Sequence, residues 1–145
     1  MAFSPITLEE IDSIEQVQKR FTKFLPGCTH LSYCERLRYL ELESLEARRL
    51  IIDLVFLFKI VSGRVPLAID SFASYGNRNT RGHRYKLLHP KFKLETRKYF
   101  FINRIVKIWN DLPDAFFNAK SVVDFQSSLK EWNRIRFYCC GCHLN

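Results

Sequence analysis

The apolar positions of this chain include one nearly continuous run and several regularly spaced patterns. The run lies in Ser44 to Gly63, where Asp53 and Lys59 are the only charged residues after position 49. Read as a helix, this stretch has almost no polar face, and such a helix is normally covered by its neighbours. Ser44 is a suitable N-cap, Glu46 complements the helix dipole, and Gly63 suits a left-handed C-terminal residue. The sequence therefore predicts a buried central helix.

A first helix is predicted between Thr7 and Leu25. Thr7 and Glu10 match a capping box at its start. Apolar residues then recur every three or four positions, at Ile11, Ile14, Val17, Phe21 and Leu25. We expect this stripe to face a core. Pro26 and Gly27 end the helix.

Three shorter patterns complete the predicted helices. Ser32 and Glu35 match a second capping box, in front of a short helix over residues 33–40. Residues 97–112 place one continuous apolar arc opposite a basic and Asn-containing arc, before Pro113 ends the pattern. The apolar arc consists of Phe101, Ile102, Ile105, Val106, Ile108, Trp109 and Leu112. A Ser121 and Asp124 cap begins a last helix that reaches about residue 137.

The stretch between the central helix and residue 97 lacks a helical pattern. Residues 64–80 contain Pro66 and Gly76 with little periodicity, which predicts a loop. Residues 81–95 interleave basic and apolar positions, which favours an extended segment or short hairpin that Pro90 interrupts. We therefore expect a mostly α-helical protein: a single domain of about five helices over residues 1–137, with an irregular basic connection. Residues 138–145 are expected to form an unstructured, Cys-rich tail.

Charge divides the chain into two different halves. Residues 1–73 carry 9 basic and 10 acidic residues, whereas residues 74–145 carry 14 and 5. The asymmetry points to a polyanionic partner for the second half. A solvated basic surface is the alternative explanation.

The basic residues concentrate between Arg78 and Lys107, where ten of them accompany one acidic residue, Glu95. Aromatic rings are interleaved with them, so the segment offers cations for phosphates and rings for unpaired bases. This composition suits RNA or single-stranded DNA. The candidate nucleic-acid ligands are Arg78, Arg81, His83, Arg84, Lys86, Lys91, Lys93, Arg97, Lys98, Phe100, Arg104 and Lys107. Phe100 lies among basic residues on the helical wheel, so it is predicted either to stack on a base or to contact a partner or the preceding segment.

Several short sequence motifs, in order along residues 14–129, resemble the C-terminal region of reverse transcriptases from LINE-class (non-LTR), jockey-like retrotransposons. The matching residues are Ile14, Glu15, Val17, Gln18, Arg20, Leu31, Ser32, Tyr33, Glu35, Arg36, Leu37, Leu45, Glu46, Arg48, Arg49, Asp53, Leu54, Phe58, Lys59, Thr80, Arg81, Gly82, His83, Phe100, Phe101, Arg104, Trp109, Asn110, Leu112, Pro113 and Phe125. The resemblance implies a segment beyond the polymerase palm and thumb that carries no catalytic aspartate. It also implies a truncated copy of such an element or a host gene that kept its last domain.

The carboxylates do not form a pattern typical of nucleotidyl transfer. Two-metal chemistry needs clustered carboxylates, and this chain has no Asp-Asp pair. Asp53, in the central helix, could act as a catalytic carboxylate, but a structural pair with Arg49 or Arg36 is the better interpretation. We expect no enzyme and no cofactor.

The cysteines and the termini carry weaker signals. Zinc-ligand residue types occur at Cys139, Cys140, Cys142 and His143, which are too close together to form a site alone. Cys28, His30 and Cys34 could in principle complete such a site, but reactive thiols are the alternative that we favour. The N-terminal residues lack a signal-peptide pattern, which predicts an intracellular protein. Asp53 and Lys59 make the central run too short and too charged for a membrane span.

These observations favour a non-catalytic accessory domain of a LINE-type reverse transcriptase that binds template RNA or target DNA. The rival hypothesis is a structural or protein-interaction helical cap of a parent polymerase domain, inactive alone. No small-molecule substrate and no membrane partner are expected. Steep salt dependence of binding would favour the first hypothesis, and an exposed hydrophobic patch would favour the second.

Overall fold

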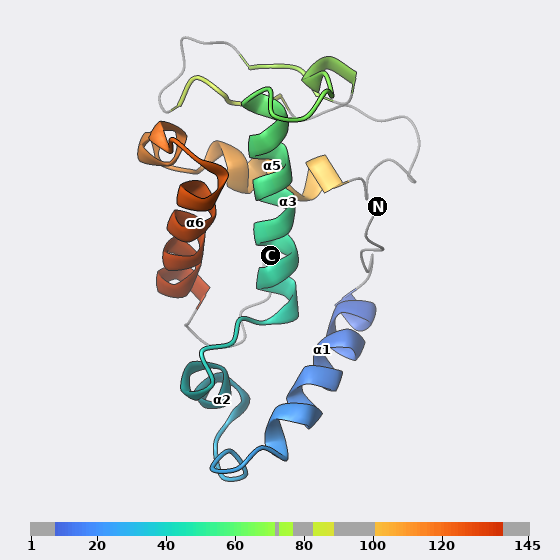
Figure 1. Ribbon diagram of the computed structural model, residues 1–145. Helices are drawn as coiled ribbons and strands as arrows, with labels where there is room; N and C mark the ends of the chain where they lie inside the picture. The colour runs from blue at the N-terminus through green and yellow to red at the C-terminus, as the bar shows by residue number, and fades with distance from the viewer. Residues whose placement is uncertain (1–7, 72, 77–82, 89–100, 138–145) are drawn as a thin grey trace. The chain divides into compact units, whose positions relative to one another are not determined.

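The computed structural model describes residues 8–71, 73–76, 83–88 and 101–137. In these ranges the helices are α1 (Leu8–Lys23), α2 (Tyr33–Tyr39), α3 (Leu45–Val61), α5 (Phe101–Asn110) and α6 (Val122–Phe137), with short 3-10 turns η1 (Ile69–Ser71) and η2 (Asp114–Asn118) (Figure 1). The prediction of a mostly α-helical protein with about five helices is confirmed.

The chain divides into two compact units. The α1–α2 unit comprises Met1–Arg49 and Trp132–Asn145, and the α3–α5 unit comprises Leu50–Glu131. Each unit has its own buried residues and its own hydrogen bonds, and each is described separately below. The prediction of one domain over residues 1–137 stays a prediction.

The two ends of α3 match the sequence prediction. The Ser44 hydroxyl oxygen accepts a hydrogen bond from the Ala47 N–H, at 3.1 Å. Gly63 has a φ of 70°. The N–H groups of Gly63 and Arg64 donate to the carbonyls of Ile60 and Lys59, at 3.0 and 2.8 Å. These two bonds are those of a Schellman motif, which satisfies carbonyls that the helix itself leaves unpaired.

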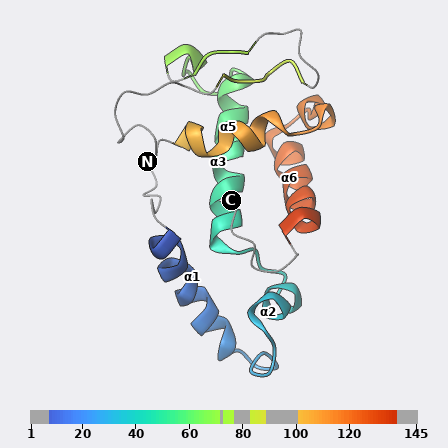
Figure 2. The ribbon, with the colours of Figure 1, turned by 180° about the vertical axis from the view of Figure 1, so that it is seen from behind.

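The α3–α5 unit holds the apolar core. α5 crosses α3 and α6 runs beside it, as opposite views show (Figures 1 and 2). Leu54 and Leu57 of α3 are buried, and the Phe58 ring stacks on that of Phe125 in α6, with centroids 4.0 Å apart. The predicted apolar arc of α5 is confirmed for its buried members Ile102, Ile105, Val106 and Trp109, and for Leu112 just beyond the helix.

Burial of α3 is less complete than the sequence predicts. Ile52 is 56% exposed and Phe56 is 38% exposed, although both lie in the apolar run. They are one helical turn apart, so they share one side of the helix. α3 therefore buries most, but not all, of its apolar surface.

The rotation of α1 is the main correction to the sequence prediction. The stripe that we expected to face a core contains Val17 and Phe21, which are 68% and 65% exposed. The buried residues of α1 are polar: Glu15 and Thr22 are 8% and 0% exposed. Hydrophobic spacing thus identified the helix correctly but assigned the wrong face to the interior.

A polar network explains this rotation. Arg36 of α2 is buried, and its guanidinium donates to the Thr22 hydroxyl at 3.1 Å and to the carbonyls of Leu31 and Lys19 at 2.6 and 3.2 Å. Because a buried guanidinium left without partners is costly, α1 must present Thr22 and the Lys19 carbonyl to α2. The polar requirement outweighs burial of the apolar stripe.

Glu15 links the start of α3 to Tyr33, whose ring lies 5.6 Å from the Arg36 guanidinium. Its carboxylate accepts hydrogen bonds from the Tyr33 hydroxyl and from the Leu45 N–H. Burial, together with this charged acceptor, raises the pKa of the Tyr33 hydroxyl above its ordinary value of 10.0. The network therefore holds Tyr33 in its neutral, donating form.

The predicted capping boxes are confirmed at two helices. Ser32 and Glu35 exchange hydrogen bonds between side chain and backbone at the start of α2. Ser121 and Asp124 do the same at the start of α6, at 3.0 and 3.1 Å. Thr7, the cap predicted for α1, lies outside the described residues.

Substitution of Leu54 tests the position of the core. Leu54 is 1% exposed, so Leu54→Ala should lower the free energy of unfolding by about 2 to 5 kcal/mol through loss of burial and creation of a cavity. The matched control is Ile52→Ala on the same helix, which should change that free energy by less than about 0.5 kcal/mol. Equal effects of the two substitutions in urea denaturation would show that α3 is rotated.

Two helix ends with the same geometry provide a second stability test. Glu41 follows α2 with a φ of 53°, and Leu42 and Glu41 donate to Leu37 and Arg38 in the same Schellman pattern as at Gly63. Because L side chains are strained at this φ, Glu41→Gly should raise the midpoint of thermal unfolding, whereas Gly63→Ala should cost about 1 kcal/mol. Destabilisation by Glu41→Gly would mean that the Glu41 side chain contributes more than its backbone strain costs.

Candidate nucleic-acid interface

The predicted basic segment is described at residues 101–107 of α5 and in a loop, residues 83–88, which we call the basic loop. Hydrogen bonds hold it against the last turn of α5. The Asn110 side chain accepts from the Leu87 N–H at 2.9 Å and donates to the Leu87 carbonyl at 2.8 Å. The Trp109 indole N–H donates to the Tyr85 carbonyl at 2.8 Å. A loop with these bonds has a defined conformation on a helical scaffold.

A short antiparallel pairing holds the other side of the basic loop. Tyr75 and Leu87 form a β-bridge. The Gly76 N–H donates to the Lys86 carbonyl and the Leu88 N–H donates to the Ser74 carbonyl, both at 2.8 Å. The prediction of an extended segment is therefore confirmed within the described residues of this region, although only as an isolated bridge.

His83, a predicted nucleic-acid ligand, is part of the core instead. It is 3% exposed, its ring stacks on Phe117 with centroids 4.0 Å apart, and it meets the Trp109 ring edge-on. Its Nε2 lies 2.9 Å from the Trp109 carbonyl, and because a carbonyl only accepts, Nε2 must carry the proton. The prediction of a surface role for His83 is corrected: this histidine anchors the basic loop.

The environment of His83 disfavours its charged form. Burial lowers its pKa below the ordinary value of 6.5 and Lys86 lowers it further, while the bond to Trp109 and the charge of Asp114 oppose the shift. The Nδ1 atom is buried and has no hydrogen-bond partner among the described residues. A proton there would be a buried donor without an acceptor, which is costly.

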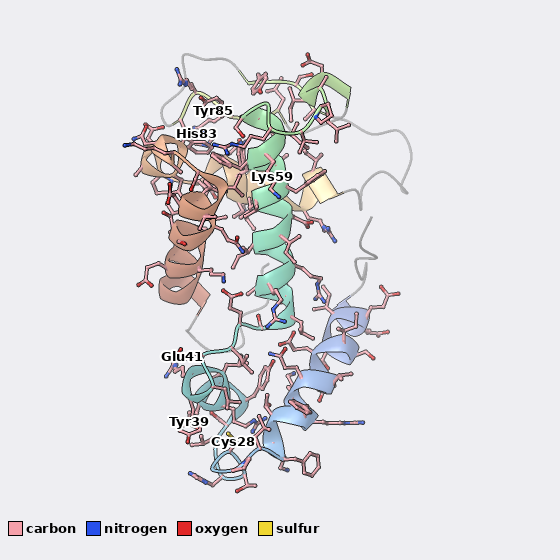
Figure 3. The ribbon with its side chains drawn as sticks, viewed as in Figure 1. Cys28, Tyr39, Glu41, Lys59, His83 and Tyr85 are labelled. Atoms are coloured by element: carbon pink, nitrogen blue, oxygen red, sulfur yellow. The ribbon has the colours of Figure 1, made fainter. Side chains whose placement is uncertain are left out.

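The side chains on the outer side of the basic loop fit the predicted function better. Arg84 is exposed, and its guanidinium lies over the Tyr85 ring, 5.0 Å from the centroid. Tyr85 and Lys86 are half-buried. Figure 3 shows His83 and Tyr85 close together in this loop. The loop thus exposes a cation that is stacked on an aromatic ring, an arrangement suited to phosphates and unpaired bases.

On α5, the two predicted ligands differ in their surroundings. Lys107 is exposed. Arg104 forms an ion pair with Asp53 of α3, with 2.7 Å between nitrogen and oxygen, and the two side chains are 33% and 22% exposed. The structural interpretation of Asp53 is confirmed by this ion pair with Arg104, a partner that the sequence did not predict. The charge of Arg104 is thus partly neutralised.

The remaining predicted ligands lie outside the described residues. These are Arg78, Arg81, Lys91, Lys93, Arg97, Lys98 and Phe100. Their assignment stays a prediction.

Sequence reasoning missed the residues that position the basic loop. Phe117 stacks on His83 and approaches Trp109 with ring centroids 5.0 Å apart. Asn110 falls in the predicted basic and Asn-containing arc, although its side chain satisfies the backbone of Leu87. The signal in the sequence was the position of Asn110, a polar residue directly after the predicted core residue Trp109. Its partner Leu87 lies 23 residues away in the sequence, so the pair could not be predicted.

The other chemical candidates gain no support. Within the described ranges, no three His, Cys, Asp or Glu side chains gather into a metal-binding group. Cys28 is buried and Cys34 is partly exposed, whereas Cys139, Cys142 and His143 lie outside the described residues. None of the described helices is both long enough and apolar enough to cross a membrane.

The buried His83 predicts a pH dependence of stability. Because its folded-state pKa lies below 6.5, the unfolded chain binds the proton more readily, so the free energy of unfolding should fall as pH decreases from about 7 through 6.5 towards the folded-state pKa. His83→Gln should reduce this slope, even where it lowers stability at pH 7.5. Urea denaturation between pH 7.5 and 5 measures both effects, and an unchanged slope in the variant would contradict the assignment.

Comparisons of this chain with known protein families, with curated proteins and with solved structures find no match. The functional argument therefore depends on the residues and on their geometry.

Proposed function

We propose that the chain is a non-catalytic nucleic-acid-binding domain that contacts single-stranded RNA or DNA through the basic segment of residues 78–107. The observation that carries the proposal is the basic loop. It holds Arg84 over the Tyr85 ring, next to Lys86, in a conformation stabilised by α5. Cations neutralise phosphates and an aromatic ring stacks on an unpaired base, so a single-strand site needs both kinds of side chain next to each other.

Charge distribution supports the same proposal. The α3–α5 unit contains 14 basic and 7 acidic residues. A surplus of this sign attracts phosphate backbones and accelerates association with them. The rigid loop reduces the conformational entropy that binding would otherwise cost.

The resemblance to LINE-type reverse transcriptases suggests the context of this binding. The proposed role is that of an accessory domain which positions template RNA or target DNA for a parent polymerase. Among the described acidic residues, Asp53 is engaged with Arg104, an ion pair that links two helices of the core. The proposal therefore assigns no catalytic step to the chain.

A structural or protein-interaction module is the second candidate function, favoured by a specific observation. Val17, Phe21 and Phe24 at the α1 surface are 68%, 65% and 84% exposed. Contiguous apolar surface of this kind marks protein contacts more often than nucleic-acid contacts. The two candidate functions use different units of the chain and are not exclusive.

A salt titration tests the proposed nucleic-acid binding. Affinity for a single-stranded RNA, measured by fluorescence anisotropy between about 50 and 200 mM salt, should fall steeply as salt rises. Arg84→Ala combined with Lys86→Ala should weaken binding and make the plot of log K against log salt shallower by about 1.4, at about 0.7 for each lost phosphate contact.

The matched control removes the same charge from the other unit. Lys23→Ala combined with Arg48→Ala also deletes two cations, here exposed ones from α1 and α3, but should leave the slope close to that of the unaltered protein. If both double variants reduce the slope equally, binding reports net charge and the basic loop is not the site. Absence of binding by the unaltered protein at physiological salt would leave the interaction module as the better proposal.

A further inference from the structure

The exposed apolar surface of α1 has the spacing of a helix-pairing seam. It comprises Ile14, Val17, Phe21 and Phe24, which we call the α1 stripe. Ile14, Val17 and Phe21 belong to α1, and Phe24 lies in the turn that continues it, with its N–H bonded to the Phe21 carbonyl. The intervals of three, four and three residues are those of alternating a and d positions in a coiled coil. Such a narrow stripe fits one partner helix better than a broad surface.

We propose that the α1 stripe pairs with the same stripe of a second copy of this chain, with the two α1 helices antiparallel. The proposal rests on the second candidate function and names its partner. In the antiparallel register, Ile14 faces Phe24 of the other copy and Val17 faces Phe21. Every layer of the seam then combines one aliphatic side chain with one aromatic ring, which fills space evenly.

The parallel alternative gives a poorer match. It would pair Phe21 with Phe21 and Phe24 with Phe24, and would leave the Ile14 and Val17 layers thin. α1 also has acidic residues in its first turn, Glu9 and Glu10, and basic residues in its last turn. In the antiparallel register the acidic first turn of each copy lies beyond the last turn of the other α1, so the charged ends are not paired. The antiparallel pair is favoured because it opposes the two helix dipoles, whereas a parallel pair aligns them and brings like charges together.

The residues beside the stripe give its two flanks different characters. In the antiparallel register Ile11 approaches Leu25 of the other copy, and this flank carries no charge. Gln18, on the same flank, donates to the Glu43 carbonyl of its own chain at 2.9 Å. On the other flank Arg20 lies next to its own equivalent at the two-fold axis. This like-charge pair weakens the dimer slightly, and it provides a direct test of orientation.

The buried face of α1 leaves the seam accessible to a partner. Glu15 and Thr22 point to α2, whereas the stripe is exposed on a different side of the helix. Four layers form a small interface, of the size typical of weak and transient complexes. We therefore expect a dimer that appears with rising protein concentration.

Sedimentation velocity of the full chain without nucleic acid tests this proposal, over about 1 μM to 1 mM, the range of weak association. The average mass should rise towards that of a dimer. Val17→Gln should raise the dissociation constant at least about tenfold, because the change occurs twice in a symmetric dimer. The matched control is Val123→Gln on α6, where the side chain is 69% exposed, compared with 68% for Val17; this control should leave association unchanged.

A mixing experiment tests the orientation. Equal amounts of the unaltered chain and of Arg20→Glu should form the mixed dimer in preference to either pure dimer, because the pair at the axis then has opposite charges. A monomer at every concentration, or equal weakening by Val17→Gln and Val123→Gln, would overturn the α1 interface, and absence of preferential mixing would overturn the antiparallel arrangement. RNA binding measured at protein concentrations where the chain is monomeric does not involve the α1 stripe, so the two proposals fail separately.

Discussion

The structure depends on one constraint: a polar group removed from water must find a hydrogen-bond partner. In the α1–α2 unit, this constraint applies to the Arg36 guanidinium and the Glu15 carboxylate, which together engage both helices and the start of α3. In the α3–α5 unit, it applies to the backbone of the basic loop, whose groups are satisfied by Trp109 and Asn110. Apolar burial supplies the driving force for each unit, but polar pairing decides which way the helices and the loop face.

Local signals were sufficient to predict the helices and their caps. Ser32 with Glu35, Ser121 with Asp124, Ser44 with Ala47 and Gly63 with Ile60 are pairs three residues apart, and their geometry follows from the helix itself. The buried arc of α5 was also predictable, because its hydrophobic period is unambiguous. The pattern could not predict the rotation of α1 about its axis. α1 has an apolar face and a face with Glu15 and Thr22, and burial of the second is favoured only because Arg36 of α2 needs hydrogen-bond partners there.

The candidate site shows the same division between local and long-range information. Its charge was evident from composition, and Arg84 retains the exposed position that the prediction needs. The role of His83 as an anchor of the loop was not evident. A histidine next to arginines in sequence suggests a surface ligand, and its contacts with Phe117 and Trp109 are known only from the structure. Likewise Arg104, which pairs with Asp53, lies 51 residues away on α5, so sequence reasoning could predict an ion pair for Asp53 but not that Arg104 would form it.

The two proposed associations have opposite physical signatures, because they use different forces in different units. Contacts between cations and phosphates weaken as salt screens them and removes the gain from counterion release. Apolar contacts along the α1 stripe carry no such dependence and are strengthened by strongly hydrated salts such as sulfate. A dimer would nevertheless double the number of basic loops available to one nucleic-acid strand, and a second contact on the same strand forms at a high effective concentration. Dimerisation through α1 would then raise nucleic-acid affinity without adding any contact to the basic loop itself.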